Sequence, residues 1–195
     1  SVAVSTRGGL PELIYRELTE HRVDLGFVTS YQENIKSIFP KTDYTIVKSY
    51  ELMLMISAHN PVYSQLEFQD GCLAEQSYRL LADLPIFQGK NDMVQKRMEE
   101  DIFPSLGIHP KWREGLIDIE FMFQTMVLEN CFSILPVSRI RGGDIVQIPF
   151  LFHPKVQRLF IYPARHHLTQ PERELITRVS DAYRDISYYY DVSLL

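Results

Sequence analysis

The residues best suited to hold a ligand are polar ones that we expect at the ends of strands and the starts of helices. They are Thr6, Arg7, Thr29, Ser30, Gln88, Gly89, Lys90, Asn91, Asp118 and Glu120. Arginine and lysine donate charge-assisted hydrogen bonds to carboxylates and phosphates. Backbone N–H groups at the start of a helix add partial positive charge. This combination predicts a site for a small polar or anionic ligand, such as a carboxylate.

Each of these residues also has an ordinary alternative. A polar loop residue can be solvated without contacting any ligand. The hydroxyl groups of Thr29 and Ser30 can instead cap the turn that follows their strand. Both interpretations stay open on the sequence alone.

Residue patterns typical of catalysis are missing from the sequence. It has no G-x-S-x-G elbow, no G-x-x-x-x-G-K-[ST] or G-x-G-x-x-G phosphate loop and no H-E-x-x-H zinc motif. His166 and His167 are adjacent in an extended segment, where neighbours point to opposite sides, so they cannot bind one metal ion together. The acidic run Glu99–Asp101 fits a solvated helix face better than a metal site. We therefore expect a binding protein, not an enzyme, with no catalytic residues, no metal and no cofactor.

The composition describes an ordinary globular chain. Of its 195 residues, 45% are hydrophobic and 23% are charged, and the net charge is −5. Without a dense Lys/Arg cluster, the chain is a poor candidate for binding nucleic acid by itself. No apolar run approaches the roughly 20 residues that span a bilayer. Cys72 and Cys131 are far apart, and Cys131 is expected to be a buried thiol, which fits a reducing cytoplasm. No secretory signal is visible at the start.

The central stretch, residues 81–140, reads as two strand-then-helix units followed by the strand CFSILP. Residues 84–87 form a short apolar strand that runs into the polar loop 88–91. In such units the carboxyl ends of strands and the starts of helices meet at one edge. The loops at that edge are where we expect the ligand.

The two helices of this stretch are expected to pack in the core. The first carries Val94, Met98 and Ile102 at four-residue steps and is closed by Gly107 as a C-terminal cap. The second begins near Asp118 or Glu120. Its core-facing residues are Phe123, Met126, Val127 and Asn130.

The flanking segments supply further strands and helices. Residues 1–5 read as a strand, a helix with Leu10, Leu13, Ile14 and Leu18 at helical spacing ends near His21-Arg22, and residues 23–30 read as a second strand. Together they are expected to form a parallel crossover unit. Residues 44–57 form an unusually long β segment. Its halves, TIVKSY and ELMLMIS, belong to two sheets or form one bent strand. The strands VQIPF and RLFIYP follow. Thr169 and Glu172 then form a capping box before a helix, whose apolar stripe is Leu175, Ile176, Val179, Ala182, Tyr183 and Ile186.

Taken in order, several stretches resemble the effector-binding domain of LysR-type transcriptional regulators. These stretches are ELTEHRVDLGFVTS, LMLMISAHNPVYS, LADLPIF, the GIHPKWREGLIDIE span, MVLENCFSILPVSRI and RLFIYPARHHLTQPERELI. The resemblance implies the type 2 periplasmic-binding-protein fold, an α/β architecture with two Rossmann-like lobes joined by crossover hinge strands. It places residues 1–49 and 149–195 in lobe I and residues 50–148 in lobe II.

The resemblance also implies a function. A small-molecule inducer would bind in the cleft between the lobes and alter the arrangement of dimers or tetramers, and so transcription. Dimerisation would involve the edge around SVAVS and the helix 92–103. DNA would be bound only through the helix-turn-helix that precedes this domain in the family and is not in this sequence. Such a regulator is cytoplasmic and does not involve a membrane. The alternative is a solute-binding protein of a transporter with the same fold; an enzyme on this fold is a third class, for which no residue set stands out.

Three departures from the family pattern are visible. By this resemblance we expect the sequence to start at the family's second strand, without the first strand and helix and the pocket residues of that strand. Residues 128–131, LENC, stand where the family has glycines, and their bulkier side chains are expected to reshape the pocket wall. The effector cannot be inferred, because members of the family bind different ones.

Overall fold

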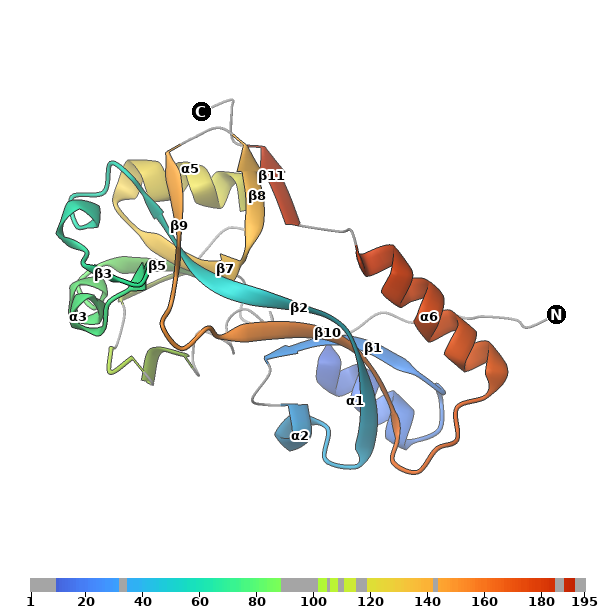
Figure 1. The fold of residues 1–195 in the computed structure, drawn as a ribbon. Coiled ribbons are helices and arrows are strands. Elements are labelled where there is room, and N and C mark those ends of the chain that lie inside the picture. The colour runs from blue at the N-terminus through green and yellow to red at the C-terminus, as the bar shows by residue number, and fades with distance from the viewer. Residues whose placement is uncertain are drawn as a thin grey trace. The chain divides into compact units, whose positions relative to one another are not determined.

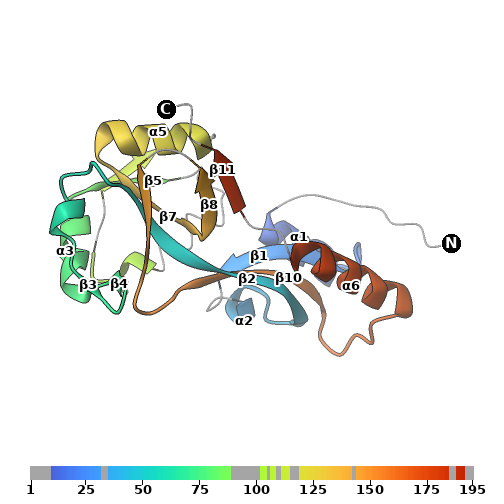
Figure 2. The same ribbon diagram turned by 45° about the horizontal axis from the view of Figure 1, so that its top comes forward.

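The structure is a computed structural model of the chain. It describes residues 10–31, 35–88, 102–104, 106–108, 111–114, 119–141, 144–184 and 188–191. The strand expected at 1–5 and most of the helix expected at 92–103 lie outside these residues. The chain divides into two compact units (Figures 1 and 2). Unit 1 comprises Ser1–Tyr50 and Val156–Ile186, and unit 2 comprises Glu51–Lys155 and Ser187–Leu195.

Hydrogen-bonded strands follow one another in the order β1-β10-β2-β7-β5-β6, with β9 also paired to β2. The helices and strands of unit 1 are α1 (Pro11–Thr19), β1 (Gly26–Tyr31), α2 (Ile35–Ile38), the first half of β2 (Thr42–Ser57), β10 (Lys155–Pro163) and α6 (Gln170–Arg184). Those of unit 2 are the second half of β2, β3 (Phe68–Gln69), β4 (Cys72–Leu73), α3 (Tyr78–Leu81), β5 (Pro85–Gln88), β6 (Lys111–Glu114), α5 (Ile119–Glu129), β7 (Phe132–Pro136), β8 (Ser138–Arg141), β9 (Ile145–Pro149) and β11 (Tyr188–Asp191), with the short 3-10 helices Tyr63–Gln65 and Glu75–Ser77.

The core of unit 1 forms between α1 and the antiparallel pair β1–β10. Gly26 lies opposite Ile161, and the pairing continues to Tyr31 opposite Val156. The buried cluster consists of Ile14, Leu18, Val28, Ile35, Phe39, Leu159 and Ile161. A Cβ at Gly26 would lie 2.7 Å from Ile14 Cγ2 and 2.8 Å from Ile161 Cγ1. Glycine is therefore required where α1 packs closest to the strand.

Helix α6 packs against the strands of unit 1 through aromatic rings. The Phe27 ring lies 4.9 Å from the ring of Phe160 and 5.5 Å from that of Tyr183. Lys48 Nζ donates to the carbonyl oxygens of Tyr183 and Arg184 at 2.9 and 2.8 Å, which places a cation at the negative end of the helix.

The apolar stripe expected on α6 is only partly covered. Ile176 is buried, Val179 and Tyr183 are half-buried, and Leu175 is 37% exposed. Ala182 is exposed, and Ile186 lies outside the described residues. The periodicity of the stripe therefore predicted the helix better than it predicted the burial of its face.

The long β segment is one strand, β2, of 16 residues. Its second half is paired on both sides: Met53 lies opposite Leu135 in β7 and opposite Pro149 in β9. The first half belongs to unit 1, where β10 is its neighbour. Of the two sequence interpretations, the single continuous strand is the correct one, although its two halves have different partners.

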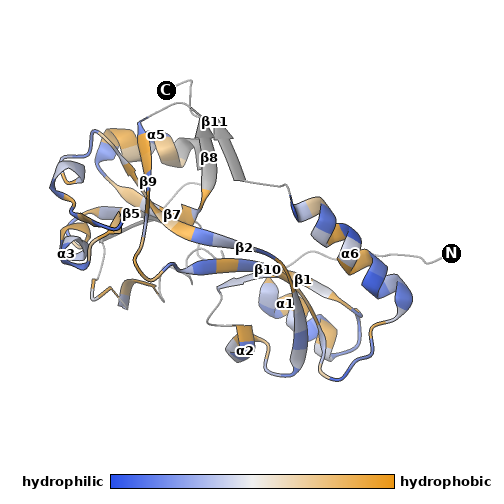
Figure 3. Ribbon diagram, viewed as in Figure 1, coloured by the Kyte–Doolittle hydropathy of each residue, from blue (hydrophilic) through white to orange (hydrophobic). Residues whose placement is uncertain are grey.

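Unit 2 contains the expected parallel strands. Ile86 in β5 lies opposite Trp112 in β6 and Phe132 in β7, and both pairings are parallel. Helix α5 supplies Met122, Phe123 and Met126 to a buried cluster with Met55, Cys131 and Leu135. Figure 3 shows hydrophobic colour running along α5, in contrast to the mixed colours of α6. The predictions that α5 is a core helix and Cys131 a buried thiol are confirmed.

Two helix ends differ in how well they were predicted. Gly107 has φ +68°, and Gly107 and Ile108 donate backbone hydrogen bonds to Pro104 and Phe103, the pattern of a glycine C-terminal cap. Asn130 was expected on the core face of α5 but follows the helix with φ 51° and is exposed. Asparagine tolerates this left-handed conformation, so it ends the helix instead of extending it. In the segment 128–131 only Cys131 is buried.

Candidate functional site

Most of the ligand residues expected from the sequence cannot be placed. Thr6, Arg7, Gly89, Lys90, Asn91 and Asp118 lie outside the described residues. Four others are placed within elements: Thr29 and Ser30 in β1, Gln88 at the end of β5, and Glu120 in the first turn of α5. As a ligand site, the whole set stays a prediction.

Thr29 and Ser30 lie next to each other near the end of β1, opposite Arg158 and Gln157 of β10. Ser30 is 2% exposed, and its Oγ donates to the Tyr31 carbonyl oxygen at 3.3 Å. Thr29 is half-buried. Because successive strand residues point to opposite faces, the two hydroxyl groups lie on different sides of the sheet.

The end of β5 meets the end of β6. Gln88 lies opposite Glu114 in the parallel pairing. Two neighbouring parallel strands have their carboxyl ends at the same edge of the sheet. The end of β5 at Gln88 therefore lies at the edge where the ligand loop was expected. Glu120 belongs to the element that follows β6, so these positions lie on consecutive elements of unit 2.

A groove of about 560 Å³ lies on unit 1, and no residue predicted as a ligand contact lines it. We call it the basic groove and define it by Lys36, Asp43, Tyr44, Tyr162, His166, His167, Leu168 and Arg173. These residues come from α2, the start of β2, the end of β10, the segment before α6 and the first turn of α6. The sequence offered a local signal only in His166-His167, expected as surface histidines before a capped helix.

Four lining residues of the basic groove are held by contacts with their neighbours. Lys36 Nζ donates to the Thr42 carbonyl oxygen at 3.3 Å and lies 5.0 Å from the centre of the Tyr44 ring. Asp43 Oδ2 accepts a hydrogen bond from the Arg165 backbone N–H at 3.1 Å. The Tyr162 hydroxyl lies 3.2 Å from Thr45 Oγ1. The groove therefore combines one carboxylate with fixed aromatic walls and the lysine ammonium.

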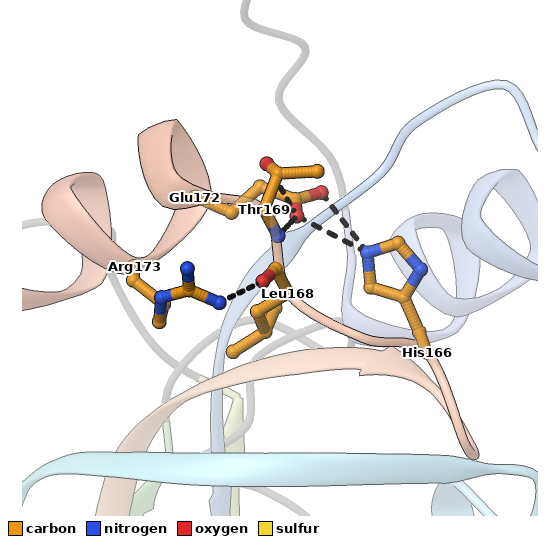
Figure 4. Close-up of polar contacts among 5 residues, drawn as sticks. All are labelled: His166, Leu168, Thr169, Glu172 and Arg173. Carbon is orange, nitrogen blue, oxygen red and sulfur yellow. Dashed lines mark hydrogen bonds and ion pairs between the residues drawn. The ribbon is translucent and has the colours of Figure 1, made fainter.

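The first turn of α6 and the segment before it supply the other lining residues of the groove. Figure 4 shows the polar contacts at this helix start. Glu172 Oε2 accepts from the Thr169 backbone N–H at 2.5 Å and from Thr169 Oγ1 at 2.8 Å. The predicted capping interaction of Thr169 with Glu172 is thus confirmed. His166 Nε2 lies 3.1 Å from both carboxylate oxygens of Glu172, and Arg173 Nη1 donates to the Leu168 carbonyl oxygen.

The carboxyl group of Glu172 has a perturbed pKa. Its burial alone would raise the pKa, but hydrogen bonds from the backbone and hydroxyl of Thr169, with the contact from His166, outweigh burial and hold the pKa below its usual value. Glu172 therefore stays ionised and occupies the positive end of the helix. Within the part of the chain that the structure describes, no group of His, Cys, Asp and Glu is arranged to hold a metal ion.

Comparisons with known proteins identify the fold. Neither a scan of protein-family models nor a search of curated proteins returns a match. Among solved structures, the C-terminal domain of a probable LysR family regulator from Rhodococcus sp. RHA1 superposes with a TM-score of 0.68 at 16% identity, covering 91% of this chain and 84% of that one. The chain has the fold of a LysR-family effector-binding domain. The type 2 periplasmic-binding-protein fold expected from the sequence is thus confirmed.

Three further structures agree. The CcmR regulatory domain of Synechocystis PCC6803, solved in complex with 2-PG, has a TM-score of 0.63 at 14% identity and covers 91% of this chain and 81% of its own. A putative LysR family regulator from Pseudomonas aeruginosa has a TM-score of 0.61 at 16% identity over 92% of this chain. This chain spans only 59% of that regulator's length. The effector-binding domain of QuiR, matched over 90% of this chain with a TM-score of 0.57 at 14% identity, was solved with shikimate.

Within the described residues, no helix is both long and apolar enough to cross a membrane.

Proposed function

We propose that this chain is the effector-binding, regulatory part of a LysR-type transcriptional regulator. The observation that carries the proposal is the shared fold over 91% of this chain and 84% of the Rhodococcus C-terminal domain. Two of the matched domains were solved with small molecules, 2-PG and shikimate. Their occupancy supports a small polar or anionic effector for this chain, which agrees with the polar residues at its strand ends. Regulation of transcription places the protein in the cytoplasm and gives it no catalytic role.

The regulatory step in this proposal is a change of assembly. Effector binding would alter how dimers or tetramers of the regulator are arranged on DNA and thereby change transcription. DNA contact would belong to a helix-turn-helix in the part of such regulators that this chain does not span. The dimer surfaces expected around SVAVS and the helix 92–103 lie outside the described residues, except for Ile102 and Phe103, which are buried.

A ligand screen with matched variants tests the proposal. Small carboxylates and organic phosphates, including shikimate and 2-PG, are titrated into the chain by calorimetry after a thermal-shift screen. We expect at least one to bind, and Thr29→Ala and Lys90→Ala each to weaken its binding about tenfold, the loss that follows removal of one charged or well-placed hydrogen bond. Lys155→Ala, an exposed lysine at the start of β10, is the control and should bind as wild type.

Assembly is followed on the same samples. Light scattering with and without the bound ligand should show a shift in dimer or tetramer content. If no compound of these classes binds, the effector-binding proposal fails. If a compound binds but both variants match wild type, the fold-based function stands and the assignment of the ligand residues is wrong.

A further inference from the structure

The basic groove of unit 1 contains cations that no carboxylate neutralises. Lys36 and Arg173 line it from α2 and α6, and within the described residues neither forms an ion pair with an acidic side chain. Two other arginines of the same unit are paired: Arg22 with Glu17 and Glu20, and Arg184 with Asp181. Lys36 and Arg173 differ from these two paired arginines, and both line the same groove.

The donors of these two cations are only partly used. An ammonium group has three N–H donors and a guanidinium group has five. Lys36 donates one long hydrogen bond, 3.3 Å, to Thr42, and Arg173 donates to Leu168. Both bonds go to neutral carbonyl oxygens and orient the side chains without cancelling their charge. Donors therefore remain for a ligand.

The positive end of α6 does not itself supply the site. Glu172 already accepts the Thr169 backbone N–H and lies 3.1 Å from His166 Nε2. The attraction for an anion rests instead on side chains brought together from separate elements. Asp43, the one carboxylate of the groove lining, opposes the binding of an anion. Its Oδ2 accepts a hydrogen bond from the Arg165 backbone N–H.

We propose that the basic groove binds a small oxyanion, a carboxylate or a phosphate, through Lys36 and Arg173. Its volume of about 560 Å³ lies within the range of sites for small molecules. A guanidinium group pairs with two oxygens of such an anion at once, and the ammonium group adds a point charge. Tyr44, Tyr162 and Leu168 also line the groove. The site is additional to the effector residues proposed on β1 and after β5, because none of those residues lines the groove.

Titration of the isotope-labelled chain by NMR tests this site. Inorganic phosphate and citrate are the probes, added at constant ionic strength so that general screening does not change. We expect saturable shifts confined to the groove residues, and the ratio of the two affinities shows whether phosphate or carboxylate is preferred. Lys36→Gln and Arg173→Gln should each weaken binding about tenfold, the usual loss when one charged hydrogen bond is removed.

Two further variants separate a site from a general charge effect. Arg178→Gln removes the same charge from the same helix at a position outside the groove and should leave binding unchanged. Asp43→Asn keeps an oxygen to accept the Arg165 N–H, removes the opposing charge and should tighten binding about threefold. A misfolded variant would lose affinity, so a gain in affinity cannot arise from misfolding.

The proposal is overturned if Lys36→Gln and Arg173→Gln, folded by circular dichroism, bind both probes as wild type does. It is overturned equally if Arg178→Gln loses as much affinity as they do. Because these variants leave Thr29 and Lys90 intact, the outcome is independent of the effector screen.

Discussion

At the scale of single residues, Glu172 has the best-defined role. It accepts both the backbone N–H and the hydroxyl of Thr169 and so closes the start of α6. Glu172→Gln should lower the free energy of unfolding by about 1 kcal/mol at neutral pH, the usual value of a helix cap. Urea unfolding measures the loss. Glu174→Gln is the control, because among the described residues the carboxylate of Glu174 accepts a hydrogen bond only from the Gln170 side chain, and it should cost much less.

The lowered pKa of Glu172 gives this prediction a pH dependence. A carboxyl group whose pKa is lower in the folded state than in the unfolded state stabilises the protein above the unfolded value, and this stabilisation is lost as the pH falls through the folded value. The difference between wild type and Glu172→Gln should therefore be full at pH 7 and shrink in acid. A difference that stays constant down to pH 3 would show that the charge of Glu172 does not contribute.

At the scale of elements, α5 distinguishes a buried from an exposed position. Phe123 is fully buried in the cluster with Met55 and Leu135, whereas Leu128 on the same helix is 81% exposed. Phe123→Ala should cost about 3–5 kcal/mol because it removes a large apolar group and leaves a cavity. Leu128→Ala should change stability by less than about 0.5 kcal/mol. Equal effects in denaturant unfolding would contradict the placement of this helix.

The strands and helices were predicted where local rules decide them. The apolar runs of β1, β5, β7 and β10, the cap at Gly107 and the start of α6 each depend on residues within a few positions of one another. Where packing decides, the sequence was insufficient. Asn130 continues the apolar face of α5 in the sequence but takes a left-handed conformation in the structure. The α6 stripe is helical as predicted, yet its burial depends on which residues of β1 and β10 lie against it.

At the scale of the whole molecule, each unit has its own buried cluster. Leu159 belongs to the cluster of unit 1 and Phe123 to that of unit 2. Stability that resides in separate cores appears as separate local unfolding events. Leu159→Ala should therefore speed amide hydrogen exchange in α1 and β1 at least about tenfold more than in α5 and β7, and Phe123→Ala should do the reverse. Uniform acceleration in both variants would show that the chain unfolds as a single cooperative body.

The sequence by itself determined the fold class, because strand and helix periodicity and their order along the chain survive where little identity remains: the Rhodococcus domain shares 16% of residues yet has the same fold. It also indicated a polar ligand edge, from the residue types at strand ends. Only the tertiary structure decided the basic groove. Lys36 and Arg173 are far apart in the chain, and no local pattern links them. They line one groove because the start of β2 lies beside the end of β10: the Ala164 N–H donates to the Lys41 carbonyl oxygen and the Arg165 N–H donates to Asp43 Oδ2.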